Sequence, residues 1–392
     1  MQSVRIGIVG FGNQGSAYVK HIHLEKKIEG AVIAAVCDVN AAKLDAQCEK
    51  FGLSCPKFTS HEALFQSGEV DAVIITTPHY FHPPIAIDAM KAGLHVLSDK
   101  PAGVYTKQVK EMIAEAGRHP DLVFGMMFNQ RTNEAYRKMR AMIAEGDLGD
   151  VKRVNWIITD WYRSQSYYDS GAWRATWRGE GGGVLFNQAP HQLDLLPWIV
   201  GMMPVKMQAH CHFGKWHDIE TEDDVTAYME FPNGATGVFV TTTGDFPGTN
   251  RLEILGTKGK LVCEKGEKLT FFESEVDERE FNRTYKGGFG TPKMTETVLI
   301  EKAEARQHVA ILQNFADAIR GLAPLQVPGV EGINGVEMMD AMLLSQWLGT
   351  MVDMPIDDDL YLAELDKRRA SGKPLAQESG TVLDTAGTYG SK

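Results

Sequence analysis

The sequence has few cysteines, and none of them is arranged to hold a metal or a disulfide framework. There are five, an odd number, scattered along the chain without a CxxC pair. A zinc site or a disulfide-stabilised fold is therefore not expected, and no metal is predicted. Cys37 lies in the apolar run 31–39, which predicts a buried, unreactive thiol.

Long apolar runs and an excess of positive charge are also missing. No stretch of about eighteen apolar residues could span a membrane, and Met1 leads almost directly into a strand-like segment at 4–9 without a signal-peptide pattern. The net charge is −11, which argues against a nucleic-acid-binding face and favours a small-molecule partner. We expect a cytoplasmic protein that binds neither membrane nor nucleic acid.

The chain is long enough, at 392 residues, for two domains, and its pattern changes part-way. The first part alternates short apolar runs with amphipathic stretches, which predicts a doubly wound parallel sheet of the Rossmann type over 1–126. Expected strands are 4–9, 32–37, 71–76, 94–98 and 122–126, and expected helices 14–29, 41–51, 60–67, 83–92 and 105–118.

From about residue 150, apolar and polar residues alternate and turn signals separate the runs, which predicts a large, mostly antiparallel sheet. We assign 127–375 to a second α/β domain for substrate binding and oligomerisation, and 376–392 to a poorly ordered polar tail. Expected strands are 151–160, 225–231, 235–243 and 251–255, and expected helices 303–320 and 334–350.

A glycine-rich loop with the pattern GxGxxG follows the first strand and opens the first helix. Such a loop turns tightly, lets backbone approach a pyrophosphate, and packs helix on strand, while the helix N-terminus supplies unpaired N–H groups. The residues concerned are Gly10, Phe11, Gly12, Asn13, Gln14 and Gly15.

Asp38 closes the second strand, where a carboxylate can accept hydrogen bonds from the adenosine ribose. A 2′-phosphate would meet a like charge there, so NAD is favoured over NADP. In the alternative interpretation Asp38 is only a turn residue at a strand end and the glycines form a simple turn. The strand, the glycine loop, the helix and Asp38 would then have their spacing by coincidence.

Two further stretches carry chemistry. Lys100 ends a strand at the edge where a doubly wound sheet binds ligands, although a Lys-Pro pair alone is more often a solvated turn. The glycines 181–183 lead into a segment in which Asn187 and His191 are four apart, on one face if that segment is helical.

In these motifs the chain resembles the glucose-fructose oxidoreductase, inositol dehydrogenase and rhizopine-catabolism family, written Gfo/Idh/MocA. The resemblance runs from the glycine loop to about residue 355 and implies a Rossmann domain and an open antiparallel sheet that packs against another subunit, hence a homodimer or homotetramer. It rests on Gly10–Gly15, Asp38, Thr77-Pro78, His82, 92–96, Lys100-Pro101, Asn129, Arg131, Trp173-Arg174, 181–183, His191 and Asp194.

The resemblance implies that Lys100 touches the nicotinamide ribose and the reacting hydroxyl, with His191 beside it as acid or base. An imidazole suits that proton transfer near neutral pH, and a lysine can stabilise the alkoxide. Asp99 replaces the family's usual glutamate, and Asn187, which we place with the catalytic pair, replaces its usual aspartate. The resemblance places on the cofactor Thr77, Pro78, His82, Asp99, Lys100, Asn129, Trp173 and Arg174.

Aromatic and polar residues alternate over 160–168 and continue at Trp173 and Trp177, which predicts a wall that stacks on sugar rings; the alternative is an aromatic core edge. Together with Asn187, this region is similar to branches of the Gfo/Idh/MocA family that act on glucosides or anhydrosugars. Some of these branches oxidise the C3 hydroxyl. Expected substrate contacts are Lys100, Tyr162, Arg163, Tyr168, Trp177, Asn187 and His191.

The sequence thus predicts an NAD-dependent oxidoreductase that oxidises a secondary hydroxyl of a sugar, glycoside or polyol. One alternative is an NAD-dependent glycosidase that oxidises C3 transiently, eliminates the aglycone and reduces the intermediate back. A dinucleotide-sensing regulator is a third interpretation, against which the retention of Lys100 and His191 argues.

Overall fold

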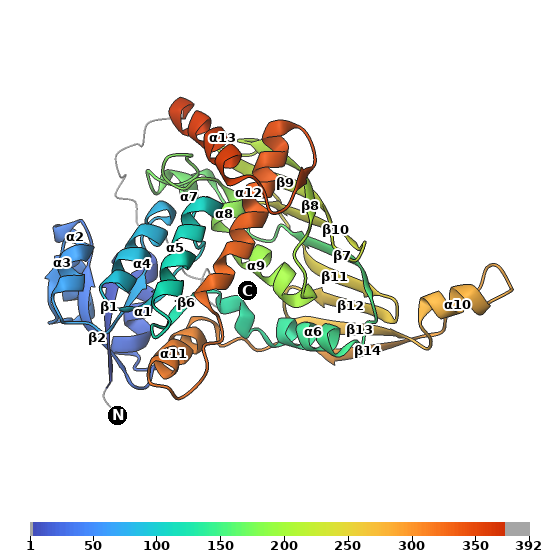
Figure 1. The fold of residues 1–392 in the computed structure, drawn as a ribbon, viewed down its shortest axis with the longest axis horizontal. Helices are drawn as coiled ribbons and strands as arrows, with labels where there is room; N and C mark the ends of the chain where they lie inside the picture. The colour runs from blue at the N-terminus through green and yellow to red at the C-terminus, as the bar shows by residue number, and fades with distance from the viewer. Residues whose placement is uncertain (1–2, 373–392) are drawn as a thin grey trace. The chain divides into compact units, whose positions relative to one another are not determined.

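The computed structural model describes residues 3–372 and divides the chain into two compact units. The first comprises 3–129 together with 306–336, and the second comprises 130–305 together with 337–372. Figure 1 shows the elements of each unit with their labels. The division at 126/127 from the sequence stays a prediction, and its proposed tail, 376–392, lies outside the described residues.

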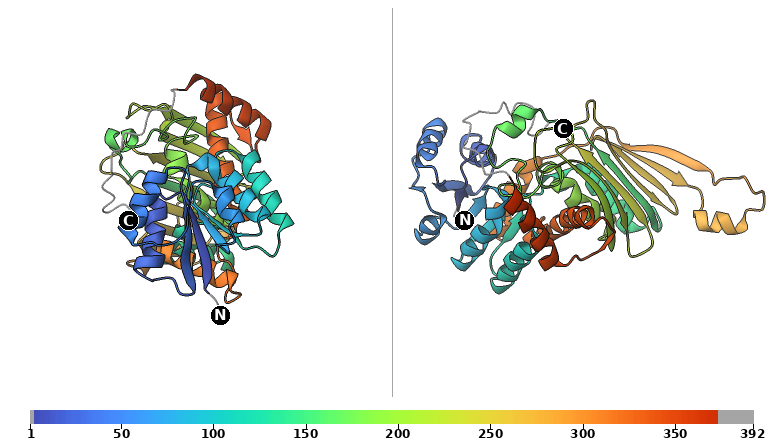
Figure 2. Two further views of the ribbon diagram at one scale, coloured as in Figure 1. Left: turned by 90° about the vertical axis from the view of Figure 1, so that its left-hand side faces the viewer. Right: turned by 90° about the horizontal axis from the view of Figure 1, so that it is seen from above.

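The first unit is built on a six-stranded parallel sheet in the order β3-β2-β1-β4-β5-β6, which confirms the expected Rossmann sheet. Figure 2 (left) shows these strands between helices, and all four residues of β4 are buried, as in a sheet covered on both faces. The strands are β1 Val4–Val9, β2 Ala31–Cys37, β3 Lys57–Phe58, β4 Ala72–Ile75, β5 His95–Ser98 and β6 Phe124–Met126.

The helices of the first unit follow the predicted ranges closely, with one difference. The helix expected over 14–29 is α1 Asn13–Val19, continued by the short π-helix η1 Lys20–Leu24. It ends there, and Lys26 shortly beyond adopts a left-handed conformation with φ 49°. The others are α2 Ala41–Phe51, α3 His61–Gln66, η2 His79–Phe81, α4 His82–Lys91, α5 Thr106–Arg118, α11 Gln307–Ile319 and η4 Gly329–Glu331.

The segment 306–336 is fastened to the first unit by backbone and side-chain contacts. Gln313 on α11 accepts a hydrogen bond from the backbone N–H of Glu29 (2.8 Å). Past α11, the N–H of Met126 in β6 donates to the carbonyl of Val327 (3.1 Å). A stretch from late in the sequence therefore completes a unit whose sheet is made early.

The second unit is built on a nine-stranded sheet in the order β14-β13-β12-β11-β7-β10-β9-β8-β15. Only the β7–β10 pair is parallel among the described strand pairs of this sheet, so the expectation of a mostly antiparallel sheet is confirmed. The strands are β7 Val151–Ile158, β8 Lys206–Phe213, β9 Glu222–Glu230, β10 Thr236–Thr242, β11 Asn250–Gly256, β12 Gly259–Glu264, β13 Lys268–Ser274, β14 Met294–Ile300 and β15 Val352–Asp353.

One face of this sheet is buried and the other is open. Residues alternate between buried and accessible along β7 to β11. The ring of Trp156 packs edge-to-face against Phe239 and tilted against Tyr136 on the buried side, which helices cover in Figure 2 (right). The helices are α6 Glu134–Glu145, α7 Gln165–Asp169, α8 Val184–Asn187, α9 Pro190–Val200, α10 Glu278–Thr284 and α13 Asp358–Ser371; α12 Gly332–Leu348 has residues in both units.

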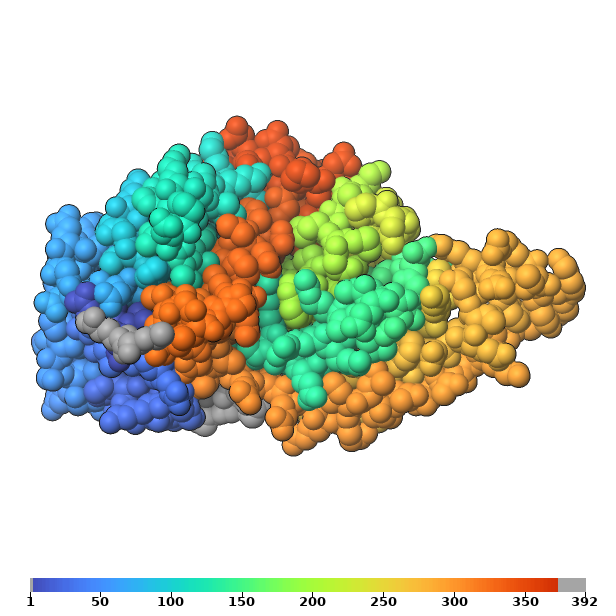
Figure 3. Space-filling model, turned by 60° about the horizontal axis from the view of Figure 1, so that its bottom comes forward, coloured from blue at the N-terminus to red at the C-terminus, as the bar shows by residue number. Residues whose placement is uncertain are grey.

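A hairpin arm extends from one end of the nine-stranded sheet. It is formed by the ends of β13 and β14 with α10 between them, and it projects from the surface in Figure 3. The first five residues of β14 are exposed and no residue of α10 is buried. Over the part of the chain that the structure describes, no helix is long and apolar enough to cross a membrane.

Candidate active site

The glycine loop has the local geometry that its sequence requires. Gly10 has φ +93°, and a Cβ there would lie 2.8 Å from the backbone of Thr76, while a Cβ on Gly15 would lie 2.4 Å from the Gly10 oxygen. A Cβ on Gly12 would meet only the Lys43 ammonium, at 3.8 Å. Two glycines thus let helix and strand pack closely, and the third leaves open space beside the backbone.

Asp38 is 8% exposed and holds this loop in place from the end of β2. Its Oδ2 accepts a hydrogen bond from the N–H of Phe11 (2.9 Å) and pairs with the Lys43 ammonium (2.8 Å), while Oδ1 accepts from the N–H of Asn40 (3.1 Å). The cation from Lys43, on α2, was not predicted from the sequence. It offsets part of the negative charge that a cofactor phosphate would meet.

The loops after β4 and β5 are joined by His82, which is 1% exposed. Its Nδ1 lies 2.8 Å from the Pro101 carbonyl and its Nε2 lies 2.6 Å from the Thr77 carbonyl. Burial lowers the pKa of His82, and a neutral imidazole donates to only one of these two carbonyls. The ring therefore connects the loop of Thr77 and Pro78 to the loop of Lys100.

Lys100 follows β5 among buried polar groups of the first unit. Asp99 accepts from the N–H of Lys100 (2.8 Å) with Oδ1 and from the hydroxyl of Tyr18 (3.0 Å) with Oδ2. The ring of His308, on α11, packs at a tilt against Tyr18 with the ring centres 5.6 Å apart, and burial lowers the pKa of His308 to about 4. Asn129 donates to Gln307 at the start of the same helix. Neither Tyr18 nor His308 was predicted, because neither lies in a recognisable motif.

In the second unit the chain approaches β9 closely at Gly183, the last of the three glycines. A Cβ on Gly183 would lie 2.1 Å from the carbonyl oxygen of Glu222. Oε1 of Glu222 accepts from the N–H groups of Gly183 (2.7 Å) and Leu185 (3.0 Å) and so holds the start of α8. Burial raises the pKa of Glu222 to about 8. The close approach of backbone at Gly183 is therefore to a glutamate of the protein itself.

Asn187 and His191 lie on two short helices, because the segment 184–200 is not one continuous helix. α8 ends at Asn187, and Pro190, which has no N–H to donate, begins α9. Gln188 and Ala189 between them keep right-handed helical dihedral angles. The continuous helix that would place both residues on one face is therefore interrupted by a turn, and that turn is itself nearly helical.

α9 is anchored by a buried ion pair between Asp194 and Arg131. The contacts are Nε to Oδ2 (2.8 Å) and Nη2 to Oδ1 (2.6 Å), and the side chains are 0% and 3% exposed. The guanidinium also lies 5.3 Å from the centre of the Trp198 ring. These two motif residues fix the helix on which His191 lies.

The predicted aromatic wall divides into interior and exposed residues. Tyr168 and Trp177 are 6% and 5% exposed; Tyr168 donates to or accepts from Thr243 (2.7 Å), and Trp177 packs against Phe213 and Trp347. Tyr162 is 51% exposed. For Tyr168 and Trp177 the alternative of a core edge agrees with their burial.

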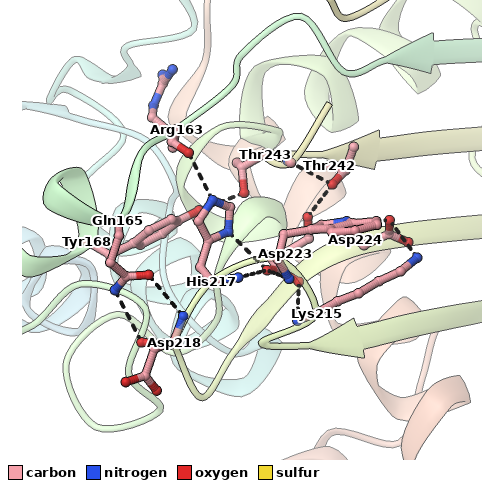
Figure 4. A network of polar contacts seen from close by, with 12 residues as sticks. Arg163, Gln165, Tyr168, Lys215, His217, Asp218, Asp223, Asp224, Thr242 and Thr243 are labelled. Atoms are coloured by element: carbon pink, nitrogen blue, oxygen red, sulfur yellow. Dashed lines mark hydrogen bonds and ion pairs between the residues drawn. The ribbon is translucent and has the colours of Figure 1, made fainter. Parts of the chain in front are cut away.

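Figure 4 shows what fixes the backbone of this wall. His217 bonds through Nδ1 to Asp223 (3.0 Å) and through Nε2 to the carbonyl of Arg163 (2.9 Å). Asp223 also accepts from the N–H groups of Lys215, Trp216 and His217. The Asp223 carboxylate therefore holds the backbone of the turn 215–217. The imidazole of His217 in this turn is in hydrogen-bond contact with the backbone of the 160–168 loop at Arg163.

A cluster of polar side chains beside the glycines 181–183 was only partly predicted from the sequence. Asn187 donates to the buried Glu180, Gln188 donates to the hydroxyl of Tyr167 (3.1 Å), and Arg174 donates to the same hydroxyl (2.8 Å). The Arg174 guanidinium also lies over the rings of Tyr167 and Trp173, at 4.5 and 4.9 Å. Glu180, Tyr167 and Gln188 were missed, although all three are within or next to motifs that the sequence displays.

Two family models match the chain, one for each part of this arrangement. The model described as "Oxidoreductase family, NAD-binding Rossmann fold" matches residues 4–126, and the model described as "GFO/IDH/MocA C-terminal domain" matches 136–262. Together they cover more than half of the chain. The chain belongs to the Gfo/Idh/MocA oxidoreductase family.

Several known proteins are similar to this chain over most of their own length. Myo-inositol 2-dehydrogenase of Thermotoga maritima is 25% identical over 274 residues, 68% of this chain and 77% of that protein. Trans-1,2-dihydrobenzene-1,2-diol dehydrogenase of Bos taurus is 29% identical over 297 residues, 72% and 84%. The WlbA dehydrogenase of Chromobacterium violaceum, solved with NADH and UDP-GlcNAcA, is 28% identical with a TM-score of 0.75, covering 91% and 97%.

Proposed function

We propose that this Gfo/Idh/MocA protein is an NAD-dependent dehydrogenase that oxidises a secondary hydroxyl of a sugar, glycoside or polyol. The main observation behind this proposal is that one chain combines two sets of residues. The glycine loop and Asp38 lie in a Rossmann unit, and Asn187 and His191 follow the glycines 181–183 in the second unit. The relatives named above, which act on inositol or a cyclic diol or bind a nucleotide sugar, support a cyclic hydroxylated substrate.

The residues of the first unit fit a dinucleotide. Gly12 leaves space beside its backbone, and the hydroxyls of Ser16 and Thr77 are buried without a protein partner among the described residues. Buried hydroxyls are normally hydrogen-bonded, so both are suited to bond a bound cofactor. When bound, the nicotinamide supplies the hydride acceptor.

Each catalytic residue has a distinct proposed task. Lys100, whose backbone is fixed by Asp99, stabilises negative charge on the substrate oxygen as its proton leaves. His191 accepts that proton as general base. Cofactor contacts by Trp173 and Arg174, and substrate contacts by Tyr162 and Arg163, belong to the same proposal; Tyr168 and Trp177, being buried, would shape the site from behind.

The test is an absorbance screen for NADH with NAD and a panel of hexoses, inositols and methyl glucosides. We propose C3 as the oxidised carbon of a glucoside, which product analysis identifies. A dehydrogenase accumulates NADH with its substrate, whereas a glycosidase that oxidises C3 only transiently releases aglycone without net NADH. Aglycone release without NADH would replace our proposal by the glycosidase.

Cofactor preference should depend on the charge balance between Asp38 and Lys43. We expect kcat/KM for NAD to exceed that for NADP, because the carboxylate repels a 2′-phosphate. Asp38→Asn retains an acceptor for the Phe11 N–H but removes the charge, so it should lower the ratio of kcat/KM for NAD to kcat/KM for NADP. Lys43→Met removes the cation 2.8 Å away and should raise this ratio. A wild type that prefers NADP would contradict the role given to Asp38.

We also propose a homodimer or homotetramer that buries the open face of the nine-stranded sheet. That face carries exposed apolar side chains on several of its central strands, including Ile157 on β7, Tyr228 on β9 and Leu255 on β11. Grouped exposed apolar residues commonly mark contact surfaces. Light scattering at micromolar concentration should give two or four chain masses; a single chain mass would refute the proposal.

A further inference from the structure

A buried carboxylate fixes the orientation of the amide next to it. Glu180, 1% exposed, accepts hydrogen bonds from the N–H of Ala175 (2.5 Å) and from Nδ2 of Asn187. A carboxylate oxygen is an acceptor, so Asn187 must turn its NH₂ group toward Glu180 and its Oδ1 away. The side-chain amide of Asn187 therefore has one orientation instead of two.

This orientation passes on to Gln188. Its Nε2 lies 3.4 Å from Oδ1 of Asn187 and 3.1 Å from the hydroxyl oxygen of Tyr167. Because Asn187 presents an oxygen, Gln188 must present its NH₂ group, and its Oε1 is left at the other end. Gln188 is 7% exposed, and this Oε1 is buried without a hydrogen-bond partner among the described residues. A buried acceptor in that state calls for a donor from a ligand.

The Tyr167 hydroxyl provides the complementary group. It accepts from Gln188 and also from Nη1 of Arg174 (2.8 Å). A phenol oxygen that receives two donors has its own proton left to give. An unpartnered acceptor and an available donor therefore belong to one small cluster.

We propose that Glu180 is a positioning residue that sets substrate specificity. By locking the Asn187–Gln188 amide pair, it makes Gln188 Oε1 accept a hydrogen bond from one substrate hydroxyl while Tyr167 donates to a neighbouring oxygen. The ligand it selects is a vicinal diol of a sugar or inositol ring, of which one hydroxyl must act as donor. This inference rests on the proposed function and specifies what its site recognises.

The test measures discrimination between a hydroxyl and a fluorine, which cannot donate. The probes are methyl glucoside and myo-inositol, with their singly fluorinated analogues at each ring position, at saturating NAD. In the wild type, fluorine at the recognised position should lower kcat/KM about tenfold or more, as expected for a buried acceptor left unpaired. In Glu180→Gln, both amides can reverse, so this ratio should fall to within about threefold.

Two further variants separate this role from a structural one. Glu180→Gln/Asn187→Asp moves the carboxylate to position 187, where it again forces Gln188 to present its NH₂ group, so discrimination should return. Glu222→Gln alters another buried glutamate beside the glycines 181–183, one that accepts hydrogen bonds from the backbone N–H groups of Gly183 and Leu185, and it should leave the ratio unchanged. A variant that merely loosens the fold lowers all rates together.

The outcomes distinguish this inference from the proposed function. Turnover with an unchanged ratio in Glu180→Gln, or no recovery in the double variant, overturns the inference alone. If no probe is oxidised, the same ratios are measured as binding to the NADH-loaded protein by calorimetry. Discrimination in binding supports the inference while the dehydrogenase proposal fails, and absence of both binding and turnover overturns both.

Discussion

Replacing His191 by alanine should lower kcat by about 10²–10⁴-fold, the usual contribution of a general acid or base. The substrate hydroxyl must lose its proton as the hydride leaves, and without the imidazole that proton passes to water. The dissociation constant for NAD should change little, because the cofactor residues that we propose lie mainly in the first unit. Single-turnover NADH formation and NAD titration separate the two effects.

A control is His210→Ala, which removes an imidazole of the same unit from β8, on the open face of the sheet that we propose the oligomer buries. It should leave kcat within experimental error of the wild type. Near-normal turnover in His191→Ala would show that His191 is not the base, and Lys100 would become the leading candidate. A large loss of NAD binding in that variant would instead indicate a cofactor role.

Asp194→Asn should be the most destabilising of the substitutions considered, at about 3–5 kcal/mol, because it leaves the Arg131 guanidinium buried without its counter-charge. For an unfolding unit of about 150–250 residues, the size range of the second unit that holds this pair, the expected fall in Tm is roughly 6–20 °C. The change follows from desolvation rather than from chemistry, so residual folded protein should retain NAD binding. Thermal unfolding followed by circular dichroism provides the measurement.

The matched comparison is Asp366→Asn, which breaks an exposed ion pair with Arg369 and should shift Tm very little. Replacing the buried pair together, as Arg131→Met/Asp194→Leu, should recover much of the loss, since no charge is then left buried. A small effect of Asp194→Asn alone would mean that water or another group reaches Arg131.

The fold was largely predictable from periodicity. The expected helix over 41–51 coincides with α2 because Asn40 caps its start and Gly52 ends it in a left-handed conformation, both local signals. What could not be predicted depends on distant contacts. The β7–β10 pair is parallel, which alternation along a strand does not reveal, and the packing of 306–336 on the first unit leaves no local trace.

The candidate site was predictable where a motif specifies backbone geometry. Gly10 and Gly15 meet their neighbours as the loop pattern requires. Tyr167 was passed over for Tyr168 because the choice depends on which side of the chain faces inward. Glu180 was missed because a glutamate before three glycines has no signature of its own, and only the folded chain brings its carboxylate to Asn187.

The first unit is made of two separate stretches of the sequence, and this has a consequence for synthesis on the ribosome. All six strands of its sheet have been translated by residue 126. The segment 306–336, which binds β6 at Met126 and the β1–β2 connection at Glu29, is complete only when residue 336 has been translated. At roughly 5–20 residues per second, that interval lasts tens of seconds or less. During this time the N–H groups of Met126 and Glu29 lack the hydrogen-bond partners that Val327 and Gln313 later provide. Nascent chains should therefore acquire cofactor-binding competence late, and a fragment ending near residue 129 should require chaperones or aggregate.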